Sequence, residues 1–184
     1  MPIRNFHGST PLSGAVRLRG DDIEPADVQC APLRKGLELW RHERGSRLFP
    51  SRQQMTPRVL GSLLYNMMLI KVVDGGREFQ VRIIGDAIVA VDSDPIQGMM
   101  TASIDKLLPG FGAMLHRNYS TVCARRAPLA MRGQFYDEAN ERLFFREHLI
   151  LPLGETDDTV DHIISIIAHM QTVTPAFLSR NGMT

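Results

Sequence analysis

One segment near the end of the chain is apolar on both of its sides, and it constrains the fold more than any other. Residues 160–171 read VDHIISIIAHMQ and are rich in the β-branched residues that are typical of strands. Apolar side chains fall on both parities, namely Val160, Ile164, Ile166, Ala168 and Met170 on one and Ile163 and Ile167 on the other. A strand with one face in solvent would alternate apolar and polar residues. We therefore expect a central strand that is covered on each face.

Four further segments read as strands, because they are rich in β-branched and aromatic residues between turn formers. They are residues 66–73, 78–84, 129–136 and 141–153. The turn Asp74-Gly75-Gly76 predicts a hairpin between the first two, and the polar run 154–158 separates the last from the central strand. In 78–84 apolar and polar residues alternate, so Phe79, Val81 and Ile83 are expected to face the interior.

A helix precedes the strands. Leu33, Leu37 and Trp40 are spaced by four and three residues, which places them on one helical face. We expect the helix to run from Leu37 to Arg44 and to stop at Gly45. This apolar stripe must be buried, either on the chain's own sheet as a cap or on the sheet of a second subunit.

Two more helices are predicted further along the chain. The first is short, runs to about Leu64, and has Thr56 as its N-cap and Pro57 as its first helical residue. The second follows Pro109-Gly110, ends near Arg126, and buries a stripe at helical spacing. That stripe consists of Phe111, Leu115, Tyr119 and Val122.

The order of these elements predicts an α+β fold, with a five-stranded antiparallel sheet, helices on one face and an N-terminal helical cap. The N-terminal end is rich in Gly, Pro and charge without a persistent period, so it is expected to be a leader without regular structure. The predicted division is a flexible leader at 1–30, a helical cap at 31–65, a core at 66–171 and a flexible tail at 172–184.

Composition excludes several classes of function. The formal net charge is +1 over 184 residues, which gives no field that would attract nucleic acid or an anionic membrane. No apolar run approaches the roughly 20 residues of a membrane-spanning helix. Cys30 and Cys123 fit two free thiols in a reduced compartment, so the chain is expected to be cytoplasmic. The basic cluster Arg41, Arg44, Arg47 and Arg52 is interpreted as a solvated helix flank rather than a phosphate site.

No metal or cofactor site is predicted. His148 and His162 fall on adjacent predicted strands, but without a nearby acid or thiol they make a poor zinc site. His116 would be the haem ligand by position, yet it lies off the buried stripe of its helix. No phosphate-binding lysine loop or nucleophile elbow is present in the sequence.

Several short motifs share the order and spacing of a known family. They are Leu39-Trp40, Leu48-Phe49-Pro50-Ser51-Arg52 with Pro57, Phe79 to Gly85, Ile96-Gln97-Gly98-Met99, Pro128 after the long helix, and Glu147 to Leu153. Over roughly residues 35–171, the chain resembles a PAS-related family of small, mostly single-domain proteins of alphaproteobacteria. Phe49 is a small departure, because a simpler Leu-Pro pair is expected there.

The resemblance implies a sensory or regulatory module of signal transduction that binds a small apolar ligand or a protein partner, possesses no catalysis and needs no cofactor. The ligand would lie between the sheet and the helices. The candidate pocket residues are Phe79, Val81, Ile83, Met99, Phe111, Leu115 and Tyr119.

Two alternatives remain open. The chain could be a small enzyme with an acid, a histidine and a tyrosine in an internal cavity, with Glu147, His148 and Tyr119 in these roles. Glu147 is otherwise expected to form a structural ion pair with Arg82 across the sheet. The chain could also be a structural homodimer that is joined through the apolar stripe of its first helix.

Overall fold

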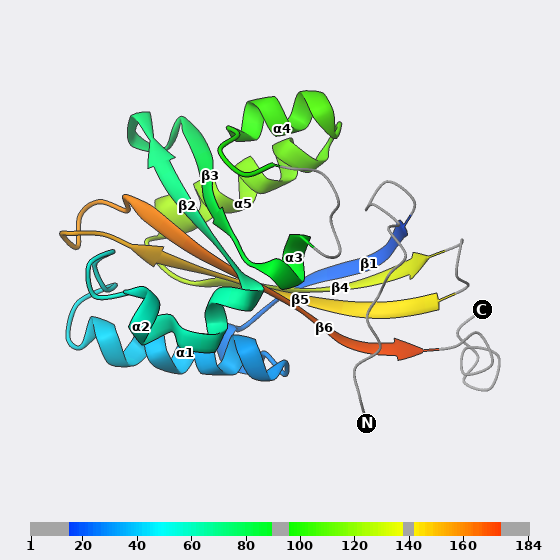
Figure 1. Cartoon of the computed structure of the whole chain (residues 1–184), viewed down its shortest axis with the longest axis horizontal. Coiled ribbons are helices and arrows are strands. Elements are labelled where there is room, and N and C mark those ends of the chain that lie inside the picture. The colour runs from blue at the N-terminus through cyan, green and yellow to red at the C-terminus, as the bar shows by residue number, and fades with distance from the viewer. Residues whose placement is uncertain (1–14, 90–95, 138–141, 174–184) are drawn as a thin grey trace.

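The computed structural model describes residues 15–89, 96–137 and 142–173, and in it six antiparallel strands form one sheet (Figure 1). The strand order is β1-β4-β5-β6-β2-β3. The strands are β1 (Ala15–Ile23), β2 (Met67–Val73), β3 (Glu78–Ile84), β4 (Leu129–Asp137), β5 (Arg142–Leu153) and β6 (His162–Val173). The predicted α+β class with an antiparallel sheet is confirmed.

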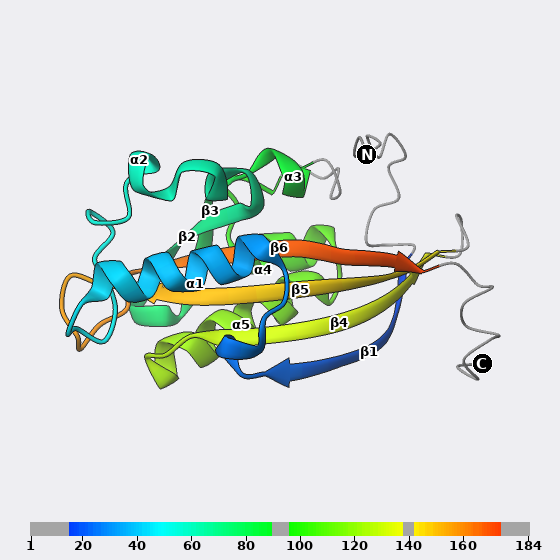
Figure 2. The ribbon, with the colours of Figure 1, turned by 90° about the horizontal axis from the view of Figure 1, so that it is seen from below.

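Helices cover both faces of this sheet. They are α1 (Ala31–Arg44), α2 (Pro57–Leu60), α3 (Asp86–Val89), α4 (Thr101–Leu107) and α5 (Phe111–Arg125), with 3-10 turns η1 (Pro25–Asp27), η2 (Gly61–Asn66) and η3 (Asp74–Gly76). The two views show α1 on one face of β5 and β6, and α5 on the opposite face with α4 beside it (Figures 1 and 2). None of the described helices is long and apolar enough to cross a membrane.

The central position of β6 is confirmed, since it pairs with β5 on one side and β2 on the other. Ile164 and Ile166 face α1, and a side chain on Gly36 of that helix would collide with Ile166. Ile163 and Ser165 have the other parity and face α5. All four β6 side chains are buried. The double apolar pattern therefore reflects two covering layers.

The apolar stripe of α1 packs on the chain's own sheet, because Leu33, Leu37 and Trp40 are all buried and α1 contacts β5 and β6. The indole Nε1 of Trp40 donates a hydrogen bond of 2.8 Å to the carbonyl of Pro152 at the end of β5. The helix ends at Gly45, whose φ of +56° favours glycine. The stripe is thus an intramolecular cap.

Replacing Trp40 by phenylalanine is expected to lower the free energy of unfolding by about 1–2 kcal/mol. The variant keeps the aromatic packing but leaves the Pro152 carbonyl without its buried donor. Urea unfolding followed by circular dichroism measures the change, since the variant has no tryptophan. The control is Tyr65→Phe, which removes a hydroxyl from a side chain that is 56% exposed and should change little. Equal stabilities of the two variants would contradict the role of the indole donor.

The leader predicted for residues 1–30 is wrong from residue 15 onward. Residues 1–14 lie outside the described part of the chain, but Ala15–Ile23 form β1 and pair with β4. This sixth strand enlarges the predicted five-stranded sheet. Its charged sequence is compatible with an edge strand, which needs only backbone hydrogen bonds to its single neighbour.

The short second helix begins as predicted, and the Thr56 hydroxyl accepts a hydrogen bond of 3.3 Å from the amide of Val59. The α-helix then ends at Leu60 rather than near Leu64. Gly61, with φ of +52°, closes it and a 3-10 turn follows.

Candidate functional site

The space between α5 and the sheet, here called the cup, is lined by aromatic and aliphatic side chains. Phe79, Val81, Leu115 and Tyr119 are all buried there. The rings of Phe79 and Tyr119 meet edge to face, with centroids 5.5 Å apart. Of the other predicted pocket residues, Met99 and Phe111 are partly buried against the core.

Ile83 does not line the cup and is 39% exposed, so its predicted interior position is wrong. The reason is a bulge in β3. Leu69 pairs with Ile83, while the next residue, Ile70, pairs with Val81. Arg82 is thus an extra residue that reverses the alternation beyond it.

Three polar side chains meet on the floor of the cup. Tyr119 comes from α5, Ser165 from β6 and His148 from β5, and the Nε2 of His148 lies 2.6 Å from the Ser165 hydroxyl. The Tyr119 hydroxyl is buried near Ser165 but makes no hydrogen bond of acceptable geometry within the described part of the chain. We call these three residues the polar cluster.

Burial sets the charge state of the polar cluster. It lowers the pKa of His148 to about 3, with a further contribution from the Arg146 guanidinium, so this imidazole is neutral near neutral pH. Burial also raises the pKa of the Tyr119 phenol, which the Ser165 hydroxyl opposes. The cluster therefore presents neutral hydrogen-bonding groups inside an apolar wall.

Ser165 was missed by the reasoning from sequence. The available signal was that it is the one polar residue in the run Ile163–Ala168, where every other residue is apolar. A hydroxyl in a strand that is covered on both faces must find a buried partner. His148 and Tyr119 were considered as reacting groups, but the sequence did not indicate that Ser165 would lie between them.

Glu147 directly precedes His148 in β5, and successive side chains of a strand alternate between faces. Glu147 therefore points to the face opposite the cup. Its carboxylate accepts hydrogen bonds from the amides of Gln29 (2.8 Å) and Cys30 (2.7 Å) at the start of α1. Arg132 of β4 donates two more, at 2.6 and 3.0 Å. The predicted ion pair with Arg82 is therefore wrong, because Arg132 is the residue opposite Glu147 in the sheet.

The electrostatics of Glu147 suit a structural anion. Burial favours its neutral form, but the hydrogen bonds from Cys30, Arg132 and Gln29 outweigh this and lower its pKa. A general acid needs the opposite shift. The predicted acid, histidine and tyrosine therefore do not come together, since only His148 and Tyr119 share the cup.

The two cysteines are free thiols, as predicted. Burial and the neighbouring Glu147 carboxylate raise the pKa of Cys30 to about 12, and burial raises that of Cys123 to about 11. A nucleophilic cysteine needs a depressed pKa. Neither thiol is therefore activated.

His116 lies outside the polar cluster. Its Nε2 is 3.1 Å from the Arg77 carbonyl, and its ring meets Phe79 edge to face at 5.2 Å. His148 and His162 do not meet, because His162 contacts the Asp161 carboxylate and pairs with Leu153. Within the described residues, no group of three or more His, Cys, Asp or Glu side chains could hold a metal ion.

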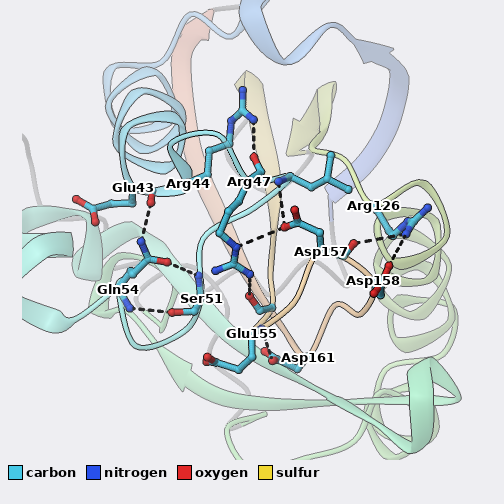
Figure 3. A network of polar contacts seen from close by, with 12 residues as sticks. Glu43, Arg44, Arg47, Ser51, Gln54, Arg126, Glu155, Asp157, Asp158 and Asp161 are labelled. Atoms are coloured by element: carbon cyan, nitrogen blue, oxygen red, sulfur yellow. Dashed lines mark hydrogen bonds and ion pairs between the residues drawn. The ribbon is translucent and has the colours of Figure 1, made fainter.

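Three residues of the predicted basic cluster, Arg44, Arg47 and Arg52, are engaged by the chain itself, while Arg41 is exposed. Figure 3 shows a network that joins the connection after α1 to the loop between β5 and β6. Arg47 donates to the Gly154 carbonyl (2.8 Å) and pairs with Asp157 (3.4 Å), while Arg44 donates to the Arg47 carbonyl. Arg52 donates to the carbonyl of Met55. These guanidinium groups therefore hold the connection after α1 and the loop between β5 and β6 in place.

A surface groove of about 440 Å³ lies away from the cup, where β1 turns into η1. Its rim carries the exposed acids Asp22, Glu24 and Asp27, and Arg125 lies beside them. It shares no residue with the polar cluster.

Comparisons with known proteins give the family. A family described as PAS domain matches residues 28–168, well over half of the chain. The chain is also similar to the crystal structure of a sensory box sensor histidine kinase from Vibrio cholerae. The sequence identity is 13% and the TM-score 0.40, over 62% of this chain and 87% of that one. No curated protein matches the chain. On the strength of the family match, this chain belongs to the PAS domain family.

Proposed function

We propose that this chain is a sensory or regulatory module of signal transduction that binds a small, largely apolar ligand in the cup. The observation that carries the proposal is the buried Tyr119 hydroxyl, which lacks a well-formed hydrogen bond within the described part of the chain. Such a group costs about 1–3 kcal/mol. A polar atom of a ligand beside Ser165 would remove that cost, while the apolar wall would hold the rest of the molecule.

Methionines beside the polar cluster support this proposal. Met68 is paired with Ser165 across the sheet, and Met131 is paired with His148. Unbranched thioether side chains adapt to the shape of a bound molecule at low cost. The ligand is accommodated by movement of these two side chains around fixed polar groups.

The proposed role includes no catalysis. Acid–base chemistry needs its groups within hydrogen-bond reach of one substrate, and Glu147 lies on the other face of the sheet from Tyr119. Binding and a conformational response are therefore the functions that we propose for the cup.

The signal passes to a protein partner in the cytoplasm. The outer face of α1 carries the exposed residues Arg34, Lys35, Glu38 and Arg41, a charged surface suited to a polar partner. A homodimer would have to use a surface of this kind, because the apolar stripe of α1 is buried on the chain's own sheet.

Native mass spectrometry of the freshly purified chain tests the ligand. We expect a mass increment of a small molecule that disappears on denaturation, and a clearly lower occupancy in Tyr119→Phe, which removes only the hydroxyl. The unliganded variant should be no less stable than wild type, because it loses an unsatisfied buried group. A wild-type chain that carries no molecule after gentle purification, or equal occupancy in both proteins, would contradict the proposal.

A further inference from the structure

The surface groove of about 440 Å³ lies between two connections of the chain. One is the turn from β1 into η1, and the other is the short link from α5 to β4. Ile23 and the two prolines Pro25 and Pro128 line it beside the carboxylates of the rim. The groove therefore combines apolar walls with acidic groups at its opening.

Both walls of the groove are held in place by the fold. On one side, the Arg132 guanidinium donates a hydrogen bond of 3.1 Å to the Asp27 carbonyl of η1, and Pro25 fixes the backbone at the start of this turn. On the other side, the amide of Arg126 donates to the Val122 carbonyl at the end of α5 (2.8 Å). A preformed groove costs a partner less free energy for ordering.

The charge at the groove is negative. Asp22, Glu24 and Asp27 are exposed, and the guanidinium of Arg125 is the cation beside them, so three carboxylates against one guanidinium leave a formal charge of −2. Within the part of the chain that the structure describes, no hydrogen bond or ion pair engages these four side chains. The whole chain has a formal net charge of +1, so this negative charge is local. Complementarity requires a cationic partner.

The groove lies at the end of an open sheet edge. Figure 2 shows β1 at one edge of the sheet, and among the described strands it pairs only with β4. Its outer backbone groups can therefore receive an extended chain as an added strand. The last pair of the ladder is Ile23 with Ala130, and both residues also line the groove. An extended segment that follows this edge thus reaches the acids.

We propose that the groove and the adjoining edge of β1 bind an extended, basic segment of a protein partner. The backbone of that segment adds to β1. Its lysine or arginine side chains meet Asp22 and Glu24, and an aliphatic side chain packs on Pro25 and Pro128. The inference goes beyond the function proposed above, because it requires no molecule in the cup.

An NMR titration of the full chain tests this proposal with a synthetic hexapeptide of alternating lysine and valine. We expect saturable shifts of the backbone amides of Ile23, Glu24 and Ala130, and weaker binding as salt is added, since the acids are exposed. A hexapeptide of alternating glutamate and valine should shift none of them. Saturable shifts that lie elsewhere, or equal shifts with both peptides, would overturn the proposal.

Two double variants of equal charge measure the contribution of the acids. Asp22→Asn with Glu24→Gln should weaken binding of the lysine peptide by about fivefold or more. Glu38→Gln with Glu155→Gln removes two exposed carboxylates outside the groove and should change the affinity less than about twofold. Equal affinities of the two double variants would contradict the role of the rim.

Arg125→Gln supplies a test of opposite sign. It removes the cation that repels a basic segment, so the affinity for the lysine peptide should rise by about twofold. A lower affinity would contradict the proposed contact.

Two other outcomes are distinguishable from the proposed one. Charged residues on an edge strand also prevent pairing between copies of a chain. If that were their only role, the variant Asp22→Asn with Glu24→Gln would self-associate in sedimentation and the peptide would shift no groove amide of wild type, which would overturn the proposal. Tyr119→Phe, which is expected to lose the cup ligand, should bind the peptide as wild type does, so failure of the cup and failure of the groove are separate results.

Discussion

Replacing Glu147 by alanine is expected to lower the free energy of unfolding by about 3 kcal/mol. The substitution leaves the Arg132 guanidinium without its carboxylate, and it leaves the amides of Gln29 and Cys30, just before α1, without their acceptor. Loss of one partner of a buried pair typically costs about 3–5 kcal/mol. Arg132 keeps 29% of its side chain exposed, so water reaches the remaining charge and the loss falls at the lower end.

Urea unfolding measures this change, and two variants calibrate it. Glu147→Gln keeps an acceptor oxygen and should lose less than the alanine variant. Glu38→Ala removes a carboxylate from the solvent face of the same helix and should stay within about 0.5 kcal/mol of wild type. A loss in Glu147→Ala no greater than that in Glu38→Ala would show that the carboxylate does not hold α1.

The contribution of Glu147 also has a defined pH dependence. Its folded-state pKa lies below the ordinary value of 4.5, so its carboxylate stabilises the fold fully above that value. The contribution is lost as pH falls through the lower folded-state pKa. The stability gap between wild type and Glu147→Gln should therefore be constant near neutral pH and shrink in acid, because other titrating groups are common to both proteins.

The central strand was predictable because its signal is local. Periodicity alone distinguishes a strand that is covered on two faces from a strand with one face in solvent. Ile164 and Ile163 indeed face different layers. The helices were predictable for the same reason, since the spacing of Leu33, Leu37 and Trp40 is a property of one segment. Tyr119 entered the candidate site through such spacing.

The groups that join the layers were not predictable in this way. The two long helices both begin at residues without a side-chain cap, Cys30 and Gly110. A carboxylate from another element lies at each of these ends: Glu147 accepts from the amides of Gln29 and Cys30 just before α1, and Asp105 accepts from the amides of Gly110 and Ala113 at the start of α5. Such a contact depends on which faces meet in the folded chain, and sequence spacing carries no information about it.

Two further differences have local physical causes. The first strand has a composition of charge and glycine that is typical of a leader, but an edge strand tolerates such a composition because the backbone makes its ladder. The position of Ile83 depends on one extra residue, Arg82, and a bulge of this kind reverses every later side chain in the strand. Neither feature leaves a mark in hydrophobic periodicity.

Replacing Gly112 by alanine is expected to lower the free energy of unfolding by about 3 kcal/mol, although alanine is the better helix former. Gly112 lies in the first turn of α5 against α4. A Cβ there would lie 2.7 Å from the Cα of Asp105, and closer still to the Thr101 carbonyl oxygen and the Asp105 amide nitrogen. These are backbone atoms, which cannot turn aside as a side chain can, so overpacking takes the upper end of its usual range of about 1–3 kcal/mol.

The neighbouring residue, Ala113, supplies the control for the predicted direction of the stability change. Ala113 is exposed in the same turn, and Ala113→Gly should cost only the helix propensity of about 1 kcal/mol. If α4 did not contact Gly112, then Gly112→Ala would stabilise the chain by a similar amount, because alanine is the better helix former. The close approach also sets the distance at which Asp105 accepts hydrogen bonds from the amides of Gly110 and Ala113. Urea unfolding that finds Gly112→Ala more stable than wild type would therefore contradict both the helix contact and this cap.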